Sequence, residues 1–240
     1  MRIAVLSDIH ANLRALEVVL ATLGEVDAVW HLGDVVGYGP DPDAVVERLR
    51  GLGAIGVCGN HDTAALGGPE IAYFNVDARR AMEWTRETIA PTTRDWLTTQ
   101  PERRSESDFS LVHGSPRDPT WEYVTTAPAA RLGLEFVTTP YVLNGHTHLP
   151  LVFRDVDGLV ETITPADGSV LRLDGRPVMA NPGSVGQPRD GDPRASAMVL
   201  DTERSELRWY RVAYDIAGTQ AAMRAVGLPA RLIERLDHGL

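Results

Sequence analysis

Five apolar runs in this chain end in the same way, with histidine, aspartate or asparagine within a residue or two, often beside glycine. The clearest case is Gly59-Asn60-His61-Asp62, which follows the apolar run Ala54-Ile55-Gly56-Val57-Cys58. The other runs lead to Asp8 with His10, to Gly33-Asp34, to His113-Gly114, and to Asn144-Gly145-His146-Thr147-His148. Buried polar groups without partners are costly, so a ligand or a dense hydrogen-bond network must satisfy these side chains.

The first part of the chain alternates apolar runs with helical patterns. Strands are predicted over 2–7, 28–32 and 54–58, and helices after Asn12 and after Asp41-Pro42. Asn12 and Asp41 are suitable N-caps, and Pro42 suits a first helical turn. A β-α-β-α-β order predicts a mostly parallel sheet with helices packed on it.

The middle and the end of the chain have different patterns. Residues 63–107 are expected to form a helical insert, with a helix capped by Asn75, inside a single domain that spans residues 1–240. Further on, three predicted hairpins imply an antiparallel second sheet. They join 151–154 to 159–163, 170–173 to 177–179, and 196–200 to 207–212.

The bulk composition narrows the possible partners and the compartment. The 240 residues carry a formal charge of −10, which argues against extended binding to nucleic acid or to an anionic membrane. The single cysteine, Cys58, lies in an apolar run, and we interpret it as a buried structural thiol in a reducing cytoplasm. We expect no signal segment and no membrane span. An anionic substrate would need a local positive centre.

The polar strand ends predict a metal centre, because ligands of open α/β sheets bind beyond the carboxyl ends of the strands. Imidazole, carboxylate and amide donors without thiolate suit Mn, Fe, Co, Ni or catalytic Zn. The candidates are too many for one ion, which favours two divalent ions ~3.5–4 Å apart and the hydrolysis of a phosphoester. The residues expected to share this crevice are Asp8, His10, Asp34, Asn60, His61, His113, His146 and His148.

Three other features have structural interpretations. His31 precedes Leu32 inside a predicted strand, and His238 stands apart from the other histidines, so neither is assigned to the site. Residues 181–184 could hold a phosphate with backbone N–H groups or make a tight turn, and we favour the turn.

In order along the chain, the five polar blocks resemble the signature blocks of the calcineurin-like metallophosphoesterases. Residues 181–189 resemble a segment of the compact bacterial and archaeal phosphodiesterase-like branch. The resemblance implies an α/β fold, a four-layer α-β-β-α sandwich of two mixed sheets flanked by helices. It also implies the metal ligands: Asp8, His10 and His148 for one ion, Asn60, His113 and His146 for the other, and Asp34 as the bridge.

The same resemblance assigns the catalytic side chains. His61 would contact the substrate and protonate the leaving group, and Asp62 would be its partner. After the second block, Val36-Gly37-Tyr38 stands where protein phosphatases of the superfamily carry an arginine. This difference argues against a protein phosphatase and weakens the symmetrical dinucleoside tetraphosphatase interpretation. With less fixed positive charge, we expect diesters to be preferred over dianionic monoesters.

The predicted function is therefore dinuclear, metal-dependent hydrolysis of a small phosphodiester or phosphomonoester. Manganese is the expected metal, with Fe, Ni, Co or Zn as alternatives. Two other functions remain open at this point: a catalytically inactive scaffold that binds proteins, and a metal-dependent nuclease. The scaffold hypothesis is disfavoured because His61 and every inferred ligand are present. The nuclease hypothesis is disfavoured by the acidic charge. The physiological substrate and the oligomeric state stay open.

Overall fold

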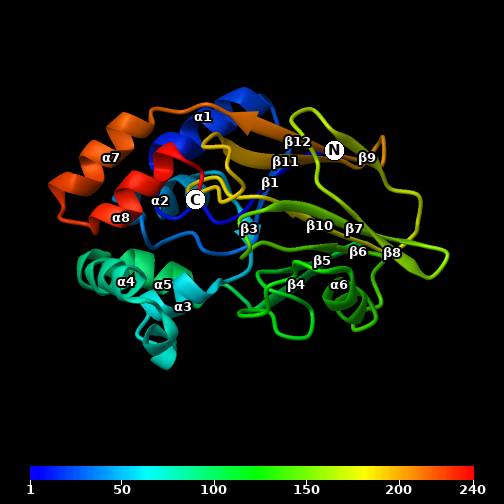
Figure 1. Cartoon of the computed structure of the whole chain (residues 1–240), viewed down its shortest axis with the longest axis horizontal. Coiled ribbons are helices and arrows are strands. Elements are labelled where there is room, and N and C mark those ends of the chain that lie inside the picture. The colour runs from blue at the N-terminus through cyan, green and yellow to red at the C-terminus, as the bar shows by residue number, and fades with distance from the viewer.

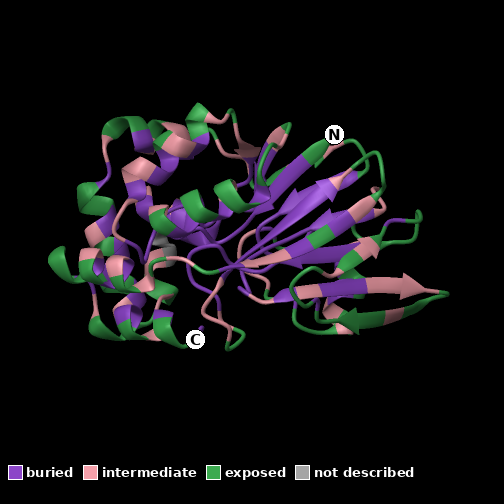
Figure 2. Cartoon of the chain, turned by 90° about the horizontal axis from the view of Figure 1, so that it is seen from above, coloured by how far each residue is buried: buried purple, intermediate pink, exposed green. Residues whose placement is uncertain are grey.

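The computed structural model contains two six-stranded sheets that pack face to face, with helices on their outer surfaces (Figure 1). It describes the whole backbone and every side chain except those of residues 69 and 70. Figure 2 shows the buried strands at the centre and most of the exposed residues on the helices and loops around them. The arrangement is the four-layer α-β-β-α sandwich of two mixed sheets that the resemblance implied.

The first sheet has the strand order β3-β2-β1-β11-β12-β9. Its strands are β1 (Arg2–Leu6), β2 (Ala28–His31), β3 (Ile55–Gly56), β9 (Val170–Arg172), β11 (Ala195–Asp201) and β12 (Glu206–Val212). β1 pairs with β2 in parallel and with β11 antiparallel, so the sheet is mixed. The parallel part is the predicted β-α-β-α-β unit, and all three of its strands end at one edge.

The second sheet has the strand order β4-β5-β6-β10-β7-β8. Its strands are β4 (Arg103–Glu106), β5 (Phe109–Val112), β6 (Tyr141–Leu143), β7 (Pro150–Val156), β8 (Leu159–Ile163) and β10 (Val178–Pro182). β6 pairs in parallel with both β5 and β10, whereas the other neighbours are antiparallel. The loops after β5 and β6 therefore leave this sheet at the same edge.

The helices are α1 (Leu13–Leu23), α2 (Pro42–Gly51), α3 (Asn60–Ala65), α4 (Val76–Thr88), α5 (Pro91–Thr98), α6 (Ala127–Leu134), α7 (Ile216–Ala225) and α8 (Ala230–Glu234), with short 3₁₀ turns η1 (Pro69–Tyr73) and η2 (Arg235–Asp237). Helices α1 and α2 pack on the outer face of the first sheet and α6 on that of the second, and the other helices gather beyond one end of the sheets (Figure 1). Asn12 and Asn75 cap α1 and α4 as predicted, accepting hydrogen bonds from Ala15 N and Ala78 N. Asp41 precedes α2, but its side chain makes no capping hydrogen bond.

The core is divided into layers that match this architecture. One apolar cluster lies between the two sheets and contains Val5, Trp30, Leu111, Leu143 and Trp209. A second cluster packs α1 and α2 on the first sheet, and a smaller one packs α6 on the second. In the part of the chain that the structure describes, no helix combines the length and apolar character needed to cross a bilayer.

Three sequence expectations about the later strands are wrong or incomplete. The hairpin predicted from 170–173 and 177–179 does not form, because β9 pairs with β12 in the first sheet and β10 pairs with β6 and β7 in the second. The second sheet is mixed rather than antiparallel. The β11–β12 hairpin forms, but it extends the first sheet. Local turn signals predict where strands end, but pairing depends on distant partners.

Candidate metal centre and the cavity above it

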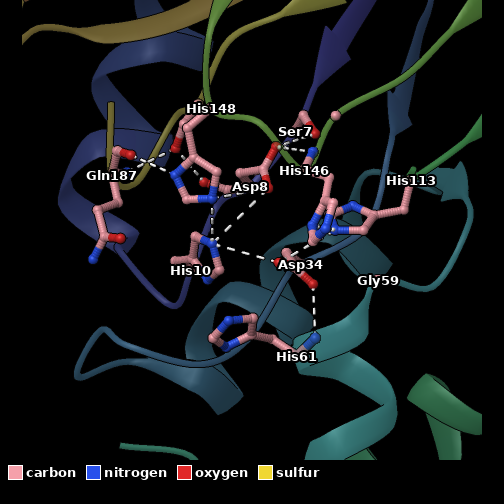
Figure 3. A network of polar contacts seen from close by, with 12 residues as sticks. Ser7, Asp8, His10, Asp34, Gly59, His61, His113, His146, His148 and Gln187 are labelled. Atoms are coloured by element: carbon pink, nitrogen blue, oxygen red, sulfur yellow. Dashed lines mark hydrogen bonds and ion pairs between the residues drawn. The ribbon is translucent and has the colours of Figure 1, made fainter. Parts of the chain in front are cut away.

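The predicted ligands come from loops that leave both sheets at the edge where β1, β2, β5 and β6 end (Figure 3). Two groups of ligand atoms form, with all atoms of each group within 4.8 Å of one another. The first group is Asp8, His10, Asp34 and His148, and the second is Asp34, His113 and His146. Asn60 lies with the second group, because its Oδ1 is 3.1 Å from His113 Nε2.

Asp34 belongs to both groups. Its Oδ2 lies 3.6 Å from His10 Nε2 and 3.4 Å from His113 Nε2. Its Oδ1 accepts a hydrogen bond of 2.8 Å from the backbone N–H of His61, which fixes the carboxylate between the two groups. Asp34 is therefore in the position that a bridging ligand requires.

The outer nitrogen of each of four imidazoles faces a main-chain carbonyl. His113 Nδ1 lies 2.8 Å from Leu32 O, and His148 Nδ1 lies 2.6 Å from Gln187 O. His10 Nδ1 and His146 Nε2 make similar contacts, at 3.3 Å to Val36 O and 3.2 Å to Trp121 O. A carbonyl can only accept, so each outer nitrogen carries a proton, and the inner nitrogen is the one that can give up its proton to bind a metal. The neutral ring with its proton on the outer nitrogen is the tautomer that a metal ligand needs.

The inner atoms of the centre mostly face one another. Asp8 Oδ1 is fully buried without a well-formed hydrogen bond, although His148 Nε2 lies 3.2 Å away. His10 Nε2 and His148 Nε2 face each other at 3.1 Å, as do His113 Nε2 and His146 Nδ1 at 3.0 Å. Lone pairs that converge in a buried site need a cation between them. The donor set thus fits divalent metal ions.

The electrostatics of the centre favour positive charge. Burial acts against ionisation, yet the imidazole of His148 lowers the pKa of Asp8. Burial likewise opposes the charge on His113, but the carboxylate of Asp34 raises the pKa of that ring to about 9. Burial lowers the pKa of His146 to about 3, so this ring is neutral and can act as a ligand. The centre therefore holds a negative potential that a cation can neutralise.

The backbone at these loops is strained. Five candidate ligands have positive φ, namely Asp8, His10, Asp34, His146 and His148. Left-handed backbone at a residue other than glycine costs on the order of 1–3 kcal/mol and persists where the surroundings enforce it. Glycines beside the ligands permit close approach: a Cβ at Gly59 would collide with the Asp34 carboxylate, and one at Gly145 with Ser7 Oγ.

The segment at 181–187 supports the ligand loops, in agreement with the turn interpretation. Ser184 Oγ donates to Asp8 O at 2.7 Å, and the backbone N–H of Gly186 donates to the same carbonyl at 3.0 Å. Asn181 Nδ2 donates to Gly145 O at 2.7 Å. These donors are used inside the protein, and they hold the Asp8 loop against the loop that carries His146.

His61 and Asp62 are both buried, but they do not form the expected pair. The His61 ring lies against Tyr38 and Phe74, and its Nδ1 is 3.0 Å from Met82 Sδ. The Asp62 carboxylate instead accepts backbone N–H bonds from Val35, Val36 and Gly59, at 2.9, 3.1 and 3.0 Å. Asp62 thus holds the loop after Asp34, which corrects the prediction that it serves His61.

The two other histidines lie outside the ligand groups. His31 ends β2, is fully buried and packs against Trp96, which matches its structural interpretation. His238 lies just after η2 at the rim of the cavity described next. Neither contributes a ligand atom to the two groups.

A cavity of about 1140 Å³ opens above the centre, and its walls contain residues that the sequence did not reveal. One wall is aromatic: Tyr73 is 81% exposed, and its ring is 5.9 Å from that of Trp121. Tyr123, 54% exposed, stacks on His146 with ring centroids 3.9 Å apart. The other wall carries Arg189, Arg231 and Arg235. Only Arg189 stood in a segment that the sequence singled out.

Comparison with known proteins agrees with this architecture. The model of the calcineurin-like phosphoesterase superfamily domain matches residues 1–205. An uncharacterised protein of Methanocaldococcus jannaschii is 34% identical over 244 residues, covering 99% of this chain and 98% of that protein. The crystal structure of a metallophosphoesterase from Sphaerobacter thermophilus superposes with a TM-score of 0.92 at 43% identity, covering 100% of this chain and 99% of that one.

Part of the chain is similar to a protein whose name gives an activity. A symmetrical bis(5′-nucleosyl)-tetraphosphatase of Aromatoleum aromaticum is 32% identical over 115 residues. The match covers 45% of this chain and 40% of that protein. The likeness is confined to part of each chain, whereas the archaeal and Sphaerobacter relatives match along nearly the whole length.

Proposed function

Because the chain belongs to the calcineurin-like phosphoesterase superfamily, we propose that it is a metal-dependent enzyme that hydrolyses small phosphodiesters, with phosphomonoesters as a second substrate class. The single observation that carries the proposal is the set of imidazoles whose outer nitrogens face carbonyls and whose inner nitrogens converge around Asp34. Nothing in a purely structural role requires this arrangement of lone pairs.

In the proposed centre, Asp8, His10 and His148 hold one divalent ion, Asn60, His113 and His146 hold the other, and Asp34 bridges them. Manganese is the first choice, and Fe, Ni, Co and Zn are compatible with the same ligands. The chemistry that such a pair of ions supplies is the activation of water and the stabilisation of charge at phosphorus.

His61 is proposed to act on the leaving group. Its ring lines the cavity beside Asn60 and belongs to neither ligand group, so it is free to meet the substrate. Burial lowers the pKa of His61 to about 4, and the carboxylate of Asp34 opposes this shift. A phosphate anion beside the ring would favour its protonated form, and the ring could then pass that proton to the leaving oxygen.

The two alternative functions, a protein-binding scaffold and a metal-dependent nuclease, fit the site less well. A scaffold has no need for the converging inner nitrogens of this centre or for an Asp8 Oδ1 without a hydrogen-bond partner among the described residues. A nuclease would benefit from a basic groove, but the chain has a formal charge of −10. The proposal therefore keeps a small-molecule substrate without extended nucleic-acid binding. It also keeps the cytoplasm as the compartment, in which the buried thiol of Cys58 would stay reduced.

The test is a hydrolysis panel on metal-stripped protein refilled separately with Mn, Ni, Co, Zn or Mg. The substrates are bis-p-nitrophenyl phosphate, p-nitrophenyl phosphate, cyclic nucleotides and dinucleoside polyphosphates. Asp34→Asn is expected to lower the bound metal more than His10→Ala or His113→Ala, because a bridging carboxylate serves both ions. Asp95→Asn, at an exposed position on α5, is the matched control. Full activity of the stripped protein would refute the proposal.

A further inference from the structure

Three arginines meet in the cavity above the proposed metal centre, although the chain as a whole is acidic. Arg189 follows the segment that supports the Asp8 loop, and its guanidinium lies 5.8 Å from the centre of the Tyr38 ring. Tyr38 in turn contacts His10 and His61, with ring centroids 4.6 and 4.3 Å apart. Arg189 is therefore separated from the centre by one aromatic ring.

Arg231 and Arg235 line the cavity from the last two elements of the chain, α8 and η2. They are four residues apart at the junction of α8 and η2, so they project from neighbouring positions of one helical surface. Leu232, Ile233 and Leu236 of the same segment are buried in a cluster with Tyr38 and with residues of α4. Gln220 fastens the segment by donating to Ile233 O and to Asp237. Packing thus holds the helical segment that carries the two arginines (α8, red in Figure 1).

These arginines lack partners among the described acidic side chains. Among the described side chains, none of the three lies within 4 Å of an acidic group, although Asp77 and Glu234 also line the cavity. Arg189 Nη2 donates to Gln187 Oε1 at 2.9 Å, but its buried Nε has no partner. Arg235 Nε donates to an oxygen of Leu240, the last residue of the sequence, and its two terminal nitrogens make no hydrogen bond with the described residues. The cluster therefore keeps free N–H donors.

Gathering like charges in this way is unfavourable unless an anion joins them. Burial lowers the pKa of Arg235 to about 10, and the nearby charges of Arg189 and Arg231 act in the same direction. Guanidinium groups bind phosphate oxygens through paired N–H bonds, more strongly than neutral donors do. A phosphate is the anion that a phosphoesterase cavity would meet.

We propose that Arg189, Arg231 and Arg235 form a second anion subsite of the cavity, which takes a phosphate group of the substrate other than the one that is cleaved. The inference rests on the proposed function and narrows its substrate class to phosphoesters with a further phosphate. Arg189 lies within residues 1–205, the part that matches the family model, whereas Arg231 and Arg235 lie beyond it. The subsite would also provide positive charge for an anionic substrate, which the sequence lacks at Val36-Gly37-Tyr38, where protein phosphatases of the superfamily carry an arginine.

The test uses two substrates that differ by one phosphate. They are thymidine 5′-(p-nitrophenyl phosphate) and its 3′-phosphorylated derivative, assayed with the metal-loaded protein. For the wild type, the 3′-phosphate is expected to lower KM by about tenfold, the effect of one charged hydrogen-bonding group. Arg231→Gln combined with Arg235→Gln should remove this difference by raising KM for the 3′-phosphorylated ester about tenfold relative to KM for the unphosphorylated ester.

The control is Arg224→Gln, an exposed arginine on α7 that does not line the cavity, and it should keep the tenfold difference. Equal KM values for the two esters in the wild type would overturn the subsite, and so would equal losses for both esters in the double variant. Calorimetric binding of thymidine 3′,5′-bisphosphate separates this inference from the proposed function. If no ester is hydrolysed, the proposed function fails, but weaker binding by the double variant would still support the subsite.

Discussion

At the scale of single residues, the position of each proton determines what the centre can do. Carbonyls of Leu32, Val36, Trp121 and Gln187 fix the outer nitrogens of four imidazoles. This leaves His61 as the histidine of the five blocks whose ring is bound to no carbonyl and is a member of neither ligand group. Its neighbours are Met82, Tyr38 and Phe74, which keep the ring in place without fixing its proton.

His61→Asn should therefore keep the metals but lose activity according to the leaving group. A nitrophenolate leaves without help, whereas an alkoxide needs a proton, and general acid catalysis contributes ~10²–10⁴-fold where the need is real. We expect a loss within this range for alkyl or nucleoside esters and a much smaller loss for nitrophenyl esters. Metal content by mass spectrometry is the control. A uniform loss with full metal occupancy would assign His61 to electrostatic stabilisation instead.

At the scale of elements, one carboxylate connects α3 to the loop that follows Asp34. Asp62 lies in the first turn of α3 and accepts from the N–H groups of Val35, Val36 and Gly59. Burial and the nearby Asp34 raise the pKa of Asp62 to about 7. The backbone hydrogen bonds from Gly59 and Val36 oppose this shift, because they stabilise the ionised carboxylate. The Asn60-His61 pair at the start of α3 is positioned by this link.

Asp62→Ala is expected to lower the free energy of unfolding by about 2–4 kcal/mol, because buried N–H donors lose their acceptor. Asp95→Ala, on the exposed side of α5, should change it by less than ~0.5 kcal/mol. Urea denaturation of the metal-stripped proteins measures both values. Similar stabilities for the two variants would show that the link to Val35 and Val36 contributes little.

Another buried titratable group at the scale of elements is His31, which ends β2 and has a structural role. Its ring packs against Trp96, and neither ring nitrogen makes a well-aligned hydrogen bond among the described residues. Burial lowers the pKa of His31 to about 4 from the usual 6.5. As the pH falls below 6.5, His31 binds a proton in the unfolded state but stays neutral in the folded state. The free energy of unfolding therefore declines until the pH reaches about 4.

For the wild type, this single group should remove about 2 kcal/mol of unfolding free energy between pH 7 and pH 5. His31→Gln is expected to reduce the slope in that range by this contribution, while other buried histidines such as His61 and His146 continue to contribute. The exposed His238 provides the control, since His238→Gln should leave the slope unchanged. Denaturation curves at several pH values, on metal-stripped protein, give the slope. An unchanged slope in the His31 variant would contradict the prediction.

At the scale of the whole molecule, the site depends on both sheets at once. Asp8, Asp34 and His61 come from the first β-α-β-α-β unit, whereas His113, His146 and His148 follow strands of the second sheet. The sheets are also connected by the 181–187 segment, which begins at the end of β10, leads toward β11 and binds the Asp8 loop. Ions bound in the centre would join the sheets further.

Metal removal is therefore expected to affect stability as well as hydrolysis. Stripped protein should be inactive and melt at a lower temperature, and a metal at 100 times its Kd should restore about 2.7 kcal/mol. Hydrolysis should weaken below neutral pH, because imidazole ligands must be deprotonated to bind metal. Differential scanning calorimetry with and without Mn measures the first effect. A melting temperature that does not respond to any of the tested metals would contradict it.

The amino-acid sequence by itself determined the polar blocks, the parallel unit and the ligand types. Those features depend on local signals: apolar periodicity, N-caps such as Asn12 and Asn75, and polar residues directly after buried strands. The rule that the carboxyl ends of parallel strands share an edge then brought the blocks together.

Only the tertiary structure decided which strands pair across long separations and what surrounds the centre. β9 and β10 were assigned to one hairpin from their turn, yet they lie in different sheets because each finds its partner elsewhere. The Asp62 carboxylate accepts hydrogen bonds from backbone donors of a distant loop. Packing of α8 against Tyr38 and α4 places Arg231 and Arg235 at the cavity. Such contacts join residues far apart in sequence, and no local pattern encodes them.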